Sequence, residues 1–393
     1  MRILASIFPL AFLAFSACGE TVLTNASDVL ALPGDQALGR NVHLRGVVTA
    51  AQPSSKLQPN WDGGFFIQDG TAGIYAVDAS RNSPKPGDLV EVTGTSHPGG
   101  FAPYIAEAHW TKVGTAPLPE ASAVPIEQLM AGIEDGQRVE ISGIVRSFTE
   151  DPPILFTEVA SGGYRVKVYS PPLPGVDPKA LIGAKVRVRG TASTFYSADL
   201  RQLISVELHV PSTNDFAVEK KQAADPFAAP VEPLNRLGQY RRDRELGERV
   251  HVRGTVTFQR PGLDLFVQDS STGIQIKSPE AVSVKPGDVV EAVGFLEFEN
   301  FLPVLDDALF RKIEAPPQTV KAIFTPISAL RAGFRHSQLI RLEGKVLDYA
   351  ERQIGDSSTG NGRQRSILTL QNAGTLFTVE GFSAGPNRAL ARV

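Results

Sequence analysis

The sequence predicts an all-β protein made of small closed barrels in tandem. Composition is the first reason: 36 glycines and 29 prolines among 393 residues indicate a turn-rich chain, and they lack the strict period of collagen. The second reason is an internal repeat that relates residue 66 to residue 266. The third is a strand pattern, with apolar and polar residues alternating up to a glycine, that occurs four times.

The internal repeat divides the chain into two halves with two modules each. The matching segments are 66–74 and 266–274 (FIQDGTAGI and FVQDSSTGI), 85–88 and 285–288 (both KPGD), and 125–132 and 326–333 (PIEQLMAG and PISALRAG). The four opening strands are 42–48, 139–145, 250–256 and 340–346. The organisation is therefore A-B-A-B, a duplicated pair of modules.

Each module has the strand pattern of a five-stranded Greek-key barrel. A glycine inside the opening strand marks a bulge or a bend at a barrel corner. In the first module a hairpin over 65–77, a turn at 85–88 and strands at 89–94 and 104–113 follow. Five strands in so short a module predict a barrel of the OB type. An immunoglobulin-like sandwich is the second choice, because it needs about seven strands.

The repeat also sets the expected boundaries. The modules are expected at 27–118, 122–212, 246–316 and 324–393, with a linker at 213–245. Pro125 and Pro326 would begin short helical elbows between modules, since proline is tolerated in the first helical turn. Lys220, Lys221, Arg241 and Arg242 are interpreted as solvated linker charges.

The fourth module matches only the first three strands of the second. Its hairpin strands are 367–370 and 376–379, and no counterpart follows for the last two strands of module 2. We therefore expect an incomplete last barrel. If the chain is natural as it stands, residues 337–393 should be poorly packed or paired with a partner. Our hypothesis at this point is that the chain is truncated at Val393.

The first eighteen residues resemble a bacterial export signal. A positive start is followed by an apolar stretch over 3–15 and by small residues before Cys18. The segment 16–19 (SACG) resembles a lipobox, so we expect Cys18 to be lipidated; the alternative is ordinary signal-peptidase cleavage near Ser16 or Ala17. The protein is then exported, periplasmic or on the cell surface, and anchored through this lipid or through a C-terminal membrane helix outside this sequence.

No catalytic motif stands out, and we predict no enzyme activity, no cofactor and no metal site. Cys18 is the only cysteine, which excludes disulfides and cysteine-based metal sites. His43 and His251 occupy the same repeat position and are expected to lie on strand surfaces. Asp69 and Asp269 are expected to cap turns. Asp306 and its neighbour Asp307 are interpreted as unpaired surface carboxylates.

Ligand-binding residues can be suggested only in the first module. Its aromatic residues, most of which we expect in the core, are Trp61, Phe65, Phe101, Tyr104 and Trp110. Trp61 and Tyr104 are the candidates for a ligand face. Since the net charge is −3 and the third module is acidic, nucleic acid is predicted to be an unlikely partner, and an unknown small molecule or protein the expected ligand.

Several of these motifs resemble a known family. The segments are 39–49 (GRNVHLRGVVT), 66–74, 85–94 (KPGDLVEVTG) and 224–231 (ADPFAAPV). Over about residues 27–393 the chain resembles the extracytoplasmic region of certain bacterial membrane-bound sensor histidine kinases. The resemblance implies tandem barrels outside the membrane, followed in the family by a transmembrane helix, a dimerisation domain and an ATP-binding domain.

The chain departs from that family in its enzymatic part. The sequence contains no second membrane helix, no phosphoacceptor histidine segment and no ATP-binding domain. We therefore expect a non-catalytic sensory region of a two-component sensor. The alternatives are an accessory region of an exported nuclease or phosphoesterase, and a free binding lipoprotein.

Overall fold

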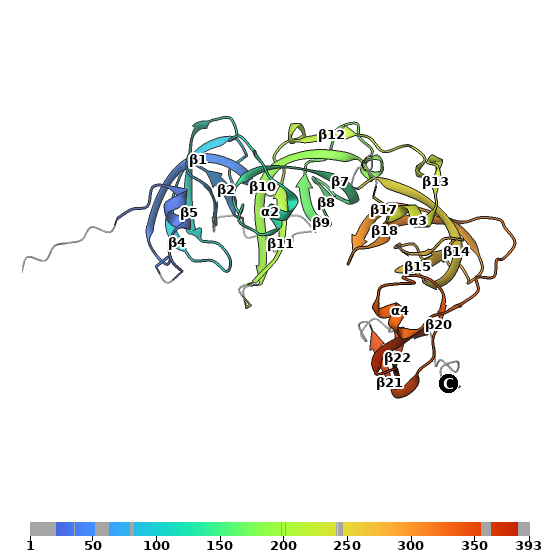
Figure 1. Ribbon diagram of the computed structural model, residues 1–393. Coiled ribbons are helices and arrows are strands. Elements are labelled where there is room, and N and C mark those ends of the chain that lie inside the picture. Colours follow the sequence, from blue (N-terminus) through green and yellow to red (C-terminus); the bar gives the residue numbers. More distant parts are fainter. Residues whose placement is uncertain are drawn as a thin grey trace, which may run out of the picture.

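A computed structural model describes residues 21–383, except 35, 52–62, 79–81, 198, 201, 241, 243–246 and 355–362. Cys18 and Trp61 lie outside the described residues, so their predicted roles stay predictions. Three closed barrels and a smaller fourth β unit follow one another along a bent row (Figure 1). Within the described ranges, no helix is long and apolar enough to cross a membrane.

Module 1 is a closed five-stranded barrel. Its strands are β1 (Asn41–Ala51), β2 (Phe65–Gln68), β3 (Gly73–Ala76), β4 (Asp88–His97) and β5 (Tyr104–Thr115). They pair in the order β1-β2-β3-β5-β4, and β3 and β5 are parallel. The alternating apolar residues of β1, such as Val42, Leu44 and Val48, point inward and are fully buried. This strand order is the Greek-key arrangement of the OB fold.

Modules 2 and 3 repeat this arrangement. Module 2 contains β7 (Arg138–Asp151), β8 (Ile154–Ser161), β9 (Tyr164–Ser170), β10 (Lys185–Ser197) and β11 (Gln202–His209), with a 3₁₀ turn η1 (Pro178–Leu181). Module 3 contains β14 (Arg249–Arg260), β15 (Asp264–Gln268), β16 (Gly273–Lys277), β17 (Val289–Glu299) and β18 (Leu302–Lys312). Pairing of β7 with β10 and of β14 with β17 closes the two barrels. The predicted all-β, OB-like fold class is confirmed.

The glycine of each opening strand lies beside a bulge, as the sequence indicated. The register shifts between Val48 and Ala50, two residues after Gly46, and the same shift follows the equivalent glycine in β7, β14 and β21 (Lys345–Ile354). A Cβ built on Gly46 would lie 2.6 Å from the carbonyl oxygen of Gln68 on the neighbouring strand. Only glycine permits this close approach, and the bulge sharpens the bend that closes the barrel.

A short edge strand and a helix precede each barrel. The pairs are β6 (Ser122–Ala123) with α2 (Ile126–Met130), β13 (Val231–Glu232) with α3 (Leu234–Leu237), and β19 (Ile323–Phe324) with α4 (Ile327–Arg331); in module 1, Leu23 bridges to Val42 ahead of α1 (Ala26–Leu30). Asp69 and Asp269 each accept a hydrogen bond from the start of the helix that precedes their own barrel. Asp69 Oδ2 accepts a hydrogen bond from the backbone N–H of Ala26 at 2.8 Å, and Asp269 Oδ2 accepts one from Leu234 at 3.0 Å.

The segment expected to be a linker is largely part of the barrels. Beyond the 3₁₀ turn η2 (Thr213–Asp215), β12 (Phe216–Lys220) extends module 2 by pairing with β10, and Phe216 is buried in its core. Farther on, the 3₁₀ turn η3 (Pro226–Ala228), β13 and α3 pack on module 3. The charged composition of 213–245 hides these short apolar anchors, which is why the sequence suggested a linker.

Module 4 is smaller than the other three in the described residues. It consists of the parallel pair β19 and β20 (Ile340–Arg341) and a three-stranded antiparallel sheet of β21, β22 (Arg363–Asn372) and β23 (Thr375–Ser383). Leu368 and Leu370 are buried, but Leu347 and Leu376 remain exposed. The incompleteness of the last barrel stays a prediction, because residues 355–362 and 384–393 lie outside the described part of the chain.

Candidate functional site

The joints between modules 1 and 2 and between modules 3 and 4 are built alike. Gln68 Oε1 accepts a hydrogen bond from the backbone N–H of Arg138 at 3.2 Å, and Gln268 Oε1 accepts one from Leu339 at 3.0 Å. These four residues belong to the repeat, so the motif FIQD of module 1 and its counterpart FVQD of module 3 each dock an A module onto the following B module. The aspartate of the same motif caps the helix. Docking and helix capping therefore explain why this motif is repeated, and no ligand is needed to account for it.

Tyr104, the ligand-face candidate within the described residues, belongs to a row of aromatic rings that leads into the first joint. Its ring lies 4.7 Å from that of His97 and 6.4 Å from that of Tyr75. Tyr75 in turn contacts Phe66, which stacks on His209 of module 2. Tyr104 is half-buried in this row and takes part in packing near the joint.

Acid is expected to destabilise this joint through His209. Burial lowers the pKa of His209 from 6.5 to about 4. Between these two pH values the unfolded chain binds a proton that the folded chain does not. The contribution of neutral His209 to the free energy of unfolding is therefore complete above pH 6.5 and is lost as the pH falls. From pH 7.5 to pH 5 the free energy of unfolding should drop by about 2 kcal/mol through this group.

Chemical denaturation of wild type and His209→Phe at both pH values checks this expectation. Burial also raises the pKa of Asp135, to about 6, which acts in the opposite direction between pH 6 and 4. Because Asp135 is present in both proteins, their difference isolates His209. His43→Phe, at an exposed position, controls for the loss of a histidine. Equal pH dependence in His209→Phe and wild type would contradict the assignment.

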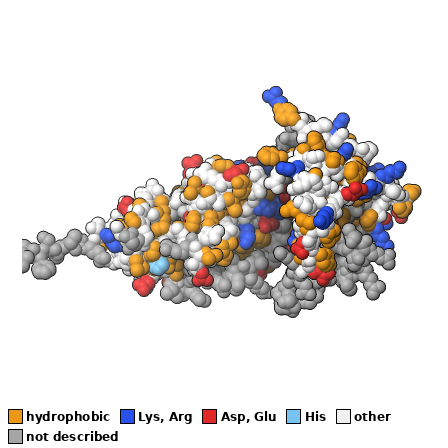
Figure 2. Space-filling view, turned by 60° about the horizontal axis from the view of Figure 1, so that its bottom comes forward, with side chains coloured by type: hydrophobic (Ala, Val, Ile, Leu, Met, Phe, Trp, Pro, Cys, Tyr) orange, Lys and Arg blue, Asp and Glu red, His pale blue; other side chains and the backbone are white. Residues whose placement is uncertain are grey.

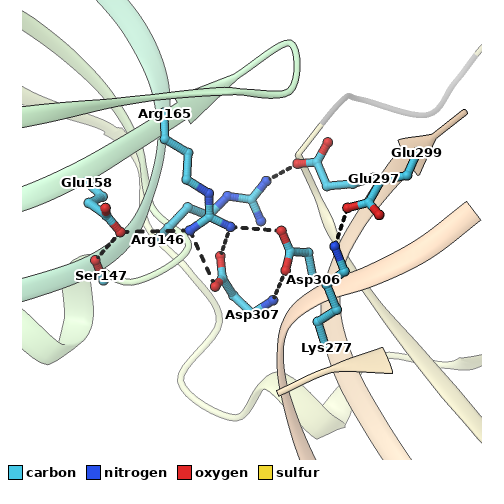
Figure 3. A network of polar contacts seen from close by, with 9 residues as sticks. All are labelled: Arg146, Ser147, Glu158, Arg165, Lys277, Glu297, Glu299, Asp306 and Asp307. Atoms are coloured by element: carbon cyan, nitrogen blue, oxygen red, sulfur yellow. Dashed lines mark hydrogen bonds and ion pairs between the residues drawn. The ribbon is translucent and has the colours of Figure 1, made fainter. Parts of the chain in front are cut away.

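The joint between modules 2 and 3 is different and rests on charge pairs. Arg165 on β9 donates to Asp306 at 2.8 Å and to Asp307 at 2.7 Å, both on β18 (Figure 3). Burial by itself would lower the pKa of Arg165, but Asp307 and Asp306 hold this pKa above its ordinary value. The expectation of unpaired surface carboxylates is therefore wrong for Asp306 and Asp307, because the following module docks against its predecessor at this point.

A buried arginine forms the centre of this joint. Arg146 on β7 has a side chain only 2% exposed and pairs with Glu297 on β17 (Figure 3). Its guanidinium carbon lies 3.6 Å from the ring centroid of Phe295, and that of Arg249 lies 4.9 Å from the same ring. Burial lowers the pKa of both Arg146 and Arg249, although Glu297 and Asp307 act in the opposite direction.

Both arginines retain hydrogen-bond donors without partners. Among the described residues, no acceptor reaches Nε and Nη1 of Arg146 or Nε of Arg249. An unpaired buried donor of a charged group is costly, and natural structures usually satisfy it with protein, water or ligand.

A cavity of about 1100 Å³ adjoins these arginines. Module 2 contributes to its wall the end of β8, the following turn at Gly162 and Gly163, and Lys185 on β10. The stretch 220–223 and, from module 3, Arg249 and Glu297 complete it. Cavities at the boundary between domains are a common location of ligand sites.

This site was not predicted from the sequence, although one signal for it is present there. Three residues after the opening-strand glycine, modules 1, 3 and 4 have Thr49, Thr257 and Leu347, whereas module 2 has Arg146. A charged residue at a position that is uncharged in the other modules could have identified the special joint. No pattern in the sequence indicated Phe295 or Arg249.

The two equivalent histidines differ in their surroundings. His43 is exposed, as expected, with 53% of its side-chain surface accessible. His251 is buried, which corrects the expectation of a surface histidine: its Nδ1 lies 2.7 Å from the carbonyl oxygen of Ala229, and the ring of Phe227 packs against it. The segment 225–232 covers this strand position in module 3.

Comparisons with known proteins give matches only among solved structures. No family model matches the chain, and neither does any curated protein. Asparaginyl-tRNA synthetase from Pyrococcus horikoshii is 15% identical over 28% of this chain and 25% of its own, with a TM-score of 0.21. A murine DNA-binding protein bound with double-stranded DNA is 13% identical over 46% of this chain and 99% of its own, with a TM-score of 0.24.

A third match is the Ifi202 HINa domain in complex with a 20-bp double-stranded DNA, which is 12% identical over 44% of this chain and 95% of its own, with a TM-score of 0.19. The chain spans about a quarter of the length of the synthetases that it matches. All three TM-scores lie below 0.5, so the fold assignment rests on the strand order of the barrels, and these matches give the sensor-kinase resemblance no support.

The prediction that nucleic acid is an unlikely partner is withdrawn: it rested on net charge, and two of the matched structures contain DNA. The physical reason is that net charge averages over the whole surface and does not describe a single groove. In Figure 2, basic and acidic side chains of the described residues are mixed over the face shown. Net charge alone therefore excludes no class of ligand.

Proposed function

We propose that this chain is a non-catalytic binding region whose ligand occupies the cavity between modules 2 and 3. The observation that carries the proposal is the position of two incompletely paired arginines, the buried Arg146 and the half-buried Arg249, beside a cavity of about 1100 Å³. Its size is close to that of small-molecule pockets, which span about 300–1000 Å³. The repeated joints elsewhere in the chain are accounted for by their own docking contacts.

A sensory role suits this arrangement. A ligand that touches both module 2 and module 3 binds best at one relative position of the two, and ligand binding then shifts the population toward that position. Such a shift could be transmitted along a row of barrels to whatever follows them. Export and lipid attachment at Cys18 stay predictions, for which mass spectrometry of the mature N-terminus is the measurement.

A thermal-shift screen with sugars, nucleotides, dicarboxylates and amino acids tests the proposed site. Ser161→Trp places a large side chain at the exposed end of β8, in the cavity wall. A ligand at a hundredfold excess over its Kd should raise the melting temperature of wild type by roughly 5–10 °C. The same compound should have little effect on Ser161→Trp.

Thr111→Trp is the matched control, because Thr111 is exposed on β5 of module 1. It should respond to the compound as wild type does. A compound that stabilises Ser161→Trp as strongly as wild type would place its site elsewhere. A screen in which no compound stabilises wild type more than Ser161→Trp would also count against the proposal.

A further inference from the structure

Positive charge exceeds negative charge around the cavity between modules 2 and 3. The charged residues in its wall are Arg146, Lys185, Lys220, Lys221, Arg249, Glu248 and Glu297. Each of the two carboxylates already forms an ion pair: Glu297 with Arg146, and Glu248 with Lys220. Within the described ranges, no ion pair reaches the other three cations. This local excess contrasts with the chain as a whole, whose net charge is −3.

The three cations without an ion pair in the described ranges differ in burial. Lys185 and Lys221 are exposed, whereas Arg249 is half-buried and its Nε has no hydrogen-bond partner in the described part of the chain. Contact with Phe295 positions the planar guanidinium groups of Arg249 and Arg146. A guanidinium held on an aromatic face keeps its donors in a fixed geometry that matches a carboxylate or phosphate.

We propose that the ligand of this cavity carries a compact oxyanion group, a phosphate or a carboxylate, which Arg249 and Arg146 bind from one side and Lys185 and Lys221 from the solvent side. Arg249 makes the first contact, because it is the more accessible arginine. Among the described residues, Nε and Nη1 of Arg146 have no acceptor, so the anion accepts from these two donors. Its negative charge then competes for Arg146 with that of Glu297, which accepts from Nη2 and is 27% exposed. This inference rests on the proposed function, whose site it shares.

Competition with Glu297 makes the joint between modules 2 and 3 sensitive to the bound anion. In the free protein the carboxylate of Glu297 on β17 links module 3 to Arg146 of module 2. An anion that takes over Arg146 weakens this link, while Arg165 still holds Asp306 and Asp307. The relative position of the two modules thereby becomes dependent on the ligand.

Titration calorimetry on the full chain with inorganic phosphate, pyrophosphate and citrate tests the inference, and these probes distinguish a phosphate from a carboxylate. Maltose serves as a neutral probe and oligothymidylate as a polyanion. Arg249→Met keeps the length and apolar packing of the side chain but removes its donors. The matched control is Arg45→Met, at an exposed position on β1 of module 1.

The expected result is saturable binding of one of the compact anions to wild type, weakened roughly ten- to a hundredfold by Arg249→Met and unchanged by Arg45→Met. Glu297→Gln should bind the anion more tightly than wild type, because the competing carboxylate is gone. Damage to the fold cannot produce that gain.

Any of three outcomes would overturn the inference. The first is that no compact anion saturates the protein, and the second is that Arg249→Met binds the anion with the same affinity as Arg45→Met. The third is that only oligothymidylate binds, with a steep salt dependence. Failure of the inference is separable from failure of the proposed function. If a neutral compound stabilises wild type but not Ser161→Trp while the anions fail, the cavity remains the binding site and only its charge preference is disproved.

Discussion

Replacing Arg146 by alanine is expected to lower the free energy of unfolding of modules 2 and 3 by about 3–5 kcal/mol. The substitution leaves Glu297 without its partner at a largely buried position and removes the group that packs on Phe295. Removing one member of a buried ion pair costs more than the pair contributes, because the remaining charge has lost its compensation. The variant should therefore open the joint before the barrels themselves unfold.

Hydrogen exchange along β8 and β17, together with chemical denaturation, checks this expectation. Arg187→Ala is the matched control: Arg187 also lies in module 2 and pairs with Glu140 and Glu219, but 37% of its side chain is exposed. Exposed pairs contribute about 0–1 kcal/mol, so this variant should resemble wild type. Equal costs for the two variants would show that burial of Arg146 has no part in holding the joint.

Gly73→Ala is expected to undock module 1 from module 2 and to cost about 3 kcal/mol. The backbone of Gly73 exchanges two hydrogen bonds with the side chain of Gln137, at 3.1 and 3.2 Å. A Cβ on Gly73 would overlap the carbonyl oxygen of Gly136, and a backbone atom at that position cannot move aside as a flexible side chain would. The modules must separate to accommodate the methyl group.

Denaturation and small-angle X-ray scattering of the variant measure the loss of stability and the change in shape. Gly70→Ala is the matched control in the same turn, since a Cβ there meets no atom within 4 Å. Gly273→Ala should repeat the effect at the joint of modules 3 and 4, where the carbonyl oxygen of Ser337 takes the place of that of Gly136. A Gly73→Ala protein as compact and stable as Gly70→Ala would refute the docking role.

Part of the candidate site could have been predicted and part could not. Arg146 breaks an uncharged pattern across the four modules, and such an exception is visible in the sequence. Its partners Glu297 and Phe295 are about 150 residues away, and no local pattern relates them to it. The cavity arises from how two closed barrels meet, a geometry to which strand periodicity is insensitive.

Local sequence patterns were sufficient to predict the barrels. Alternation along each opening strand decides which side chains face the core, the internal glycine decides where the strand bulges, and the turn residues decide where hairpins reverse. These are interactions between near neighbours, so a short stretch of sequence contains the information. The repeat then indicated how many times the same unit occurs.

The way in which the barrels dock could not be predicted from these local patterns. Asp306 and Asp307 became partners of Arg165 because closed modules meet through their outer surfaces. His251 became buried because residues 225–232 pack over its strand. An exposed aspartate and one that faces a neighbouring module have the same local pattern. The difference lies in the orientation of one rigid barrel relative to the next, which depends on many weak contacts between residues far apart in the chain.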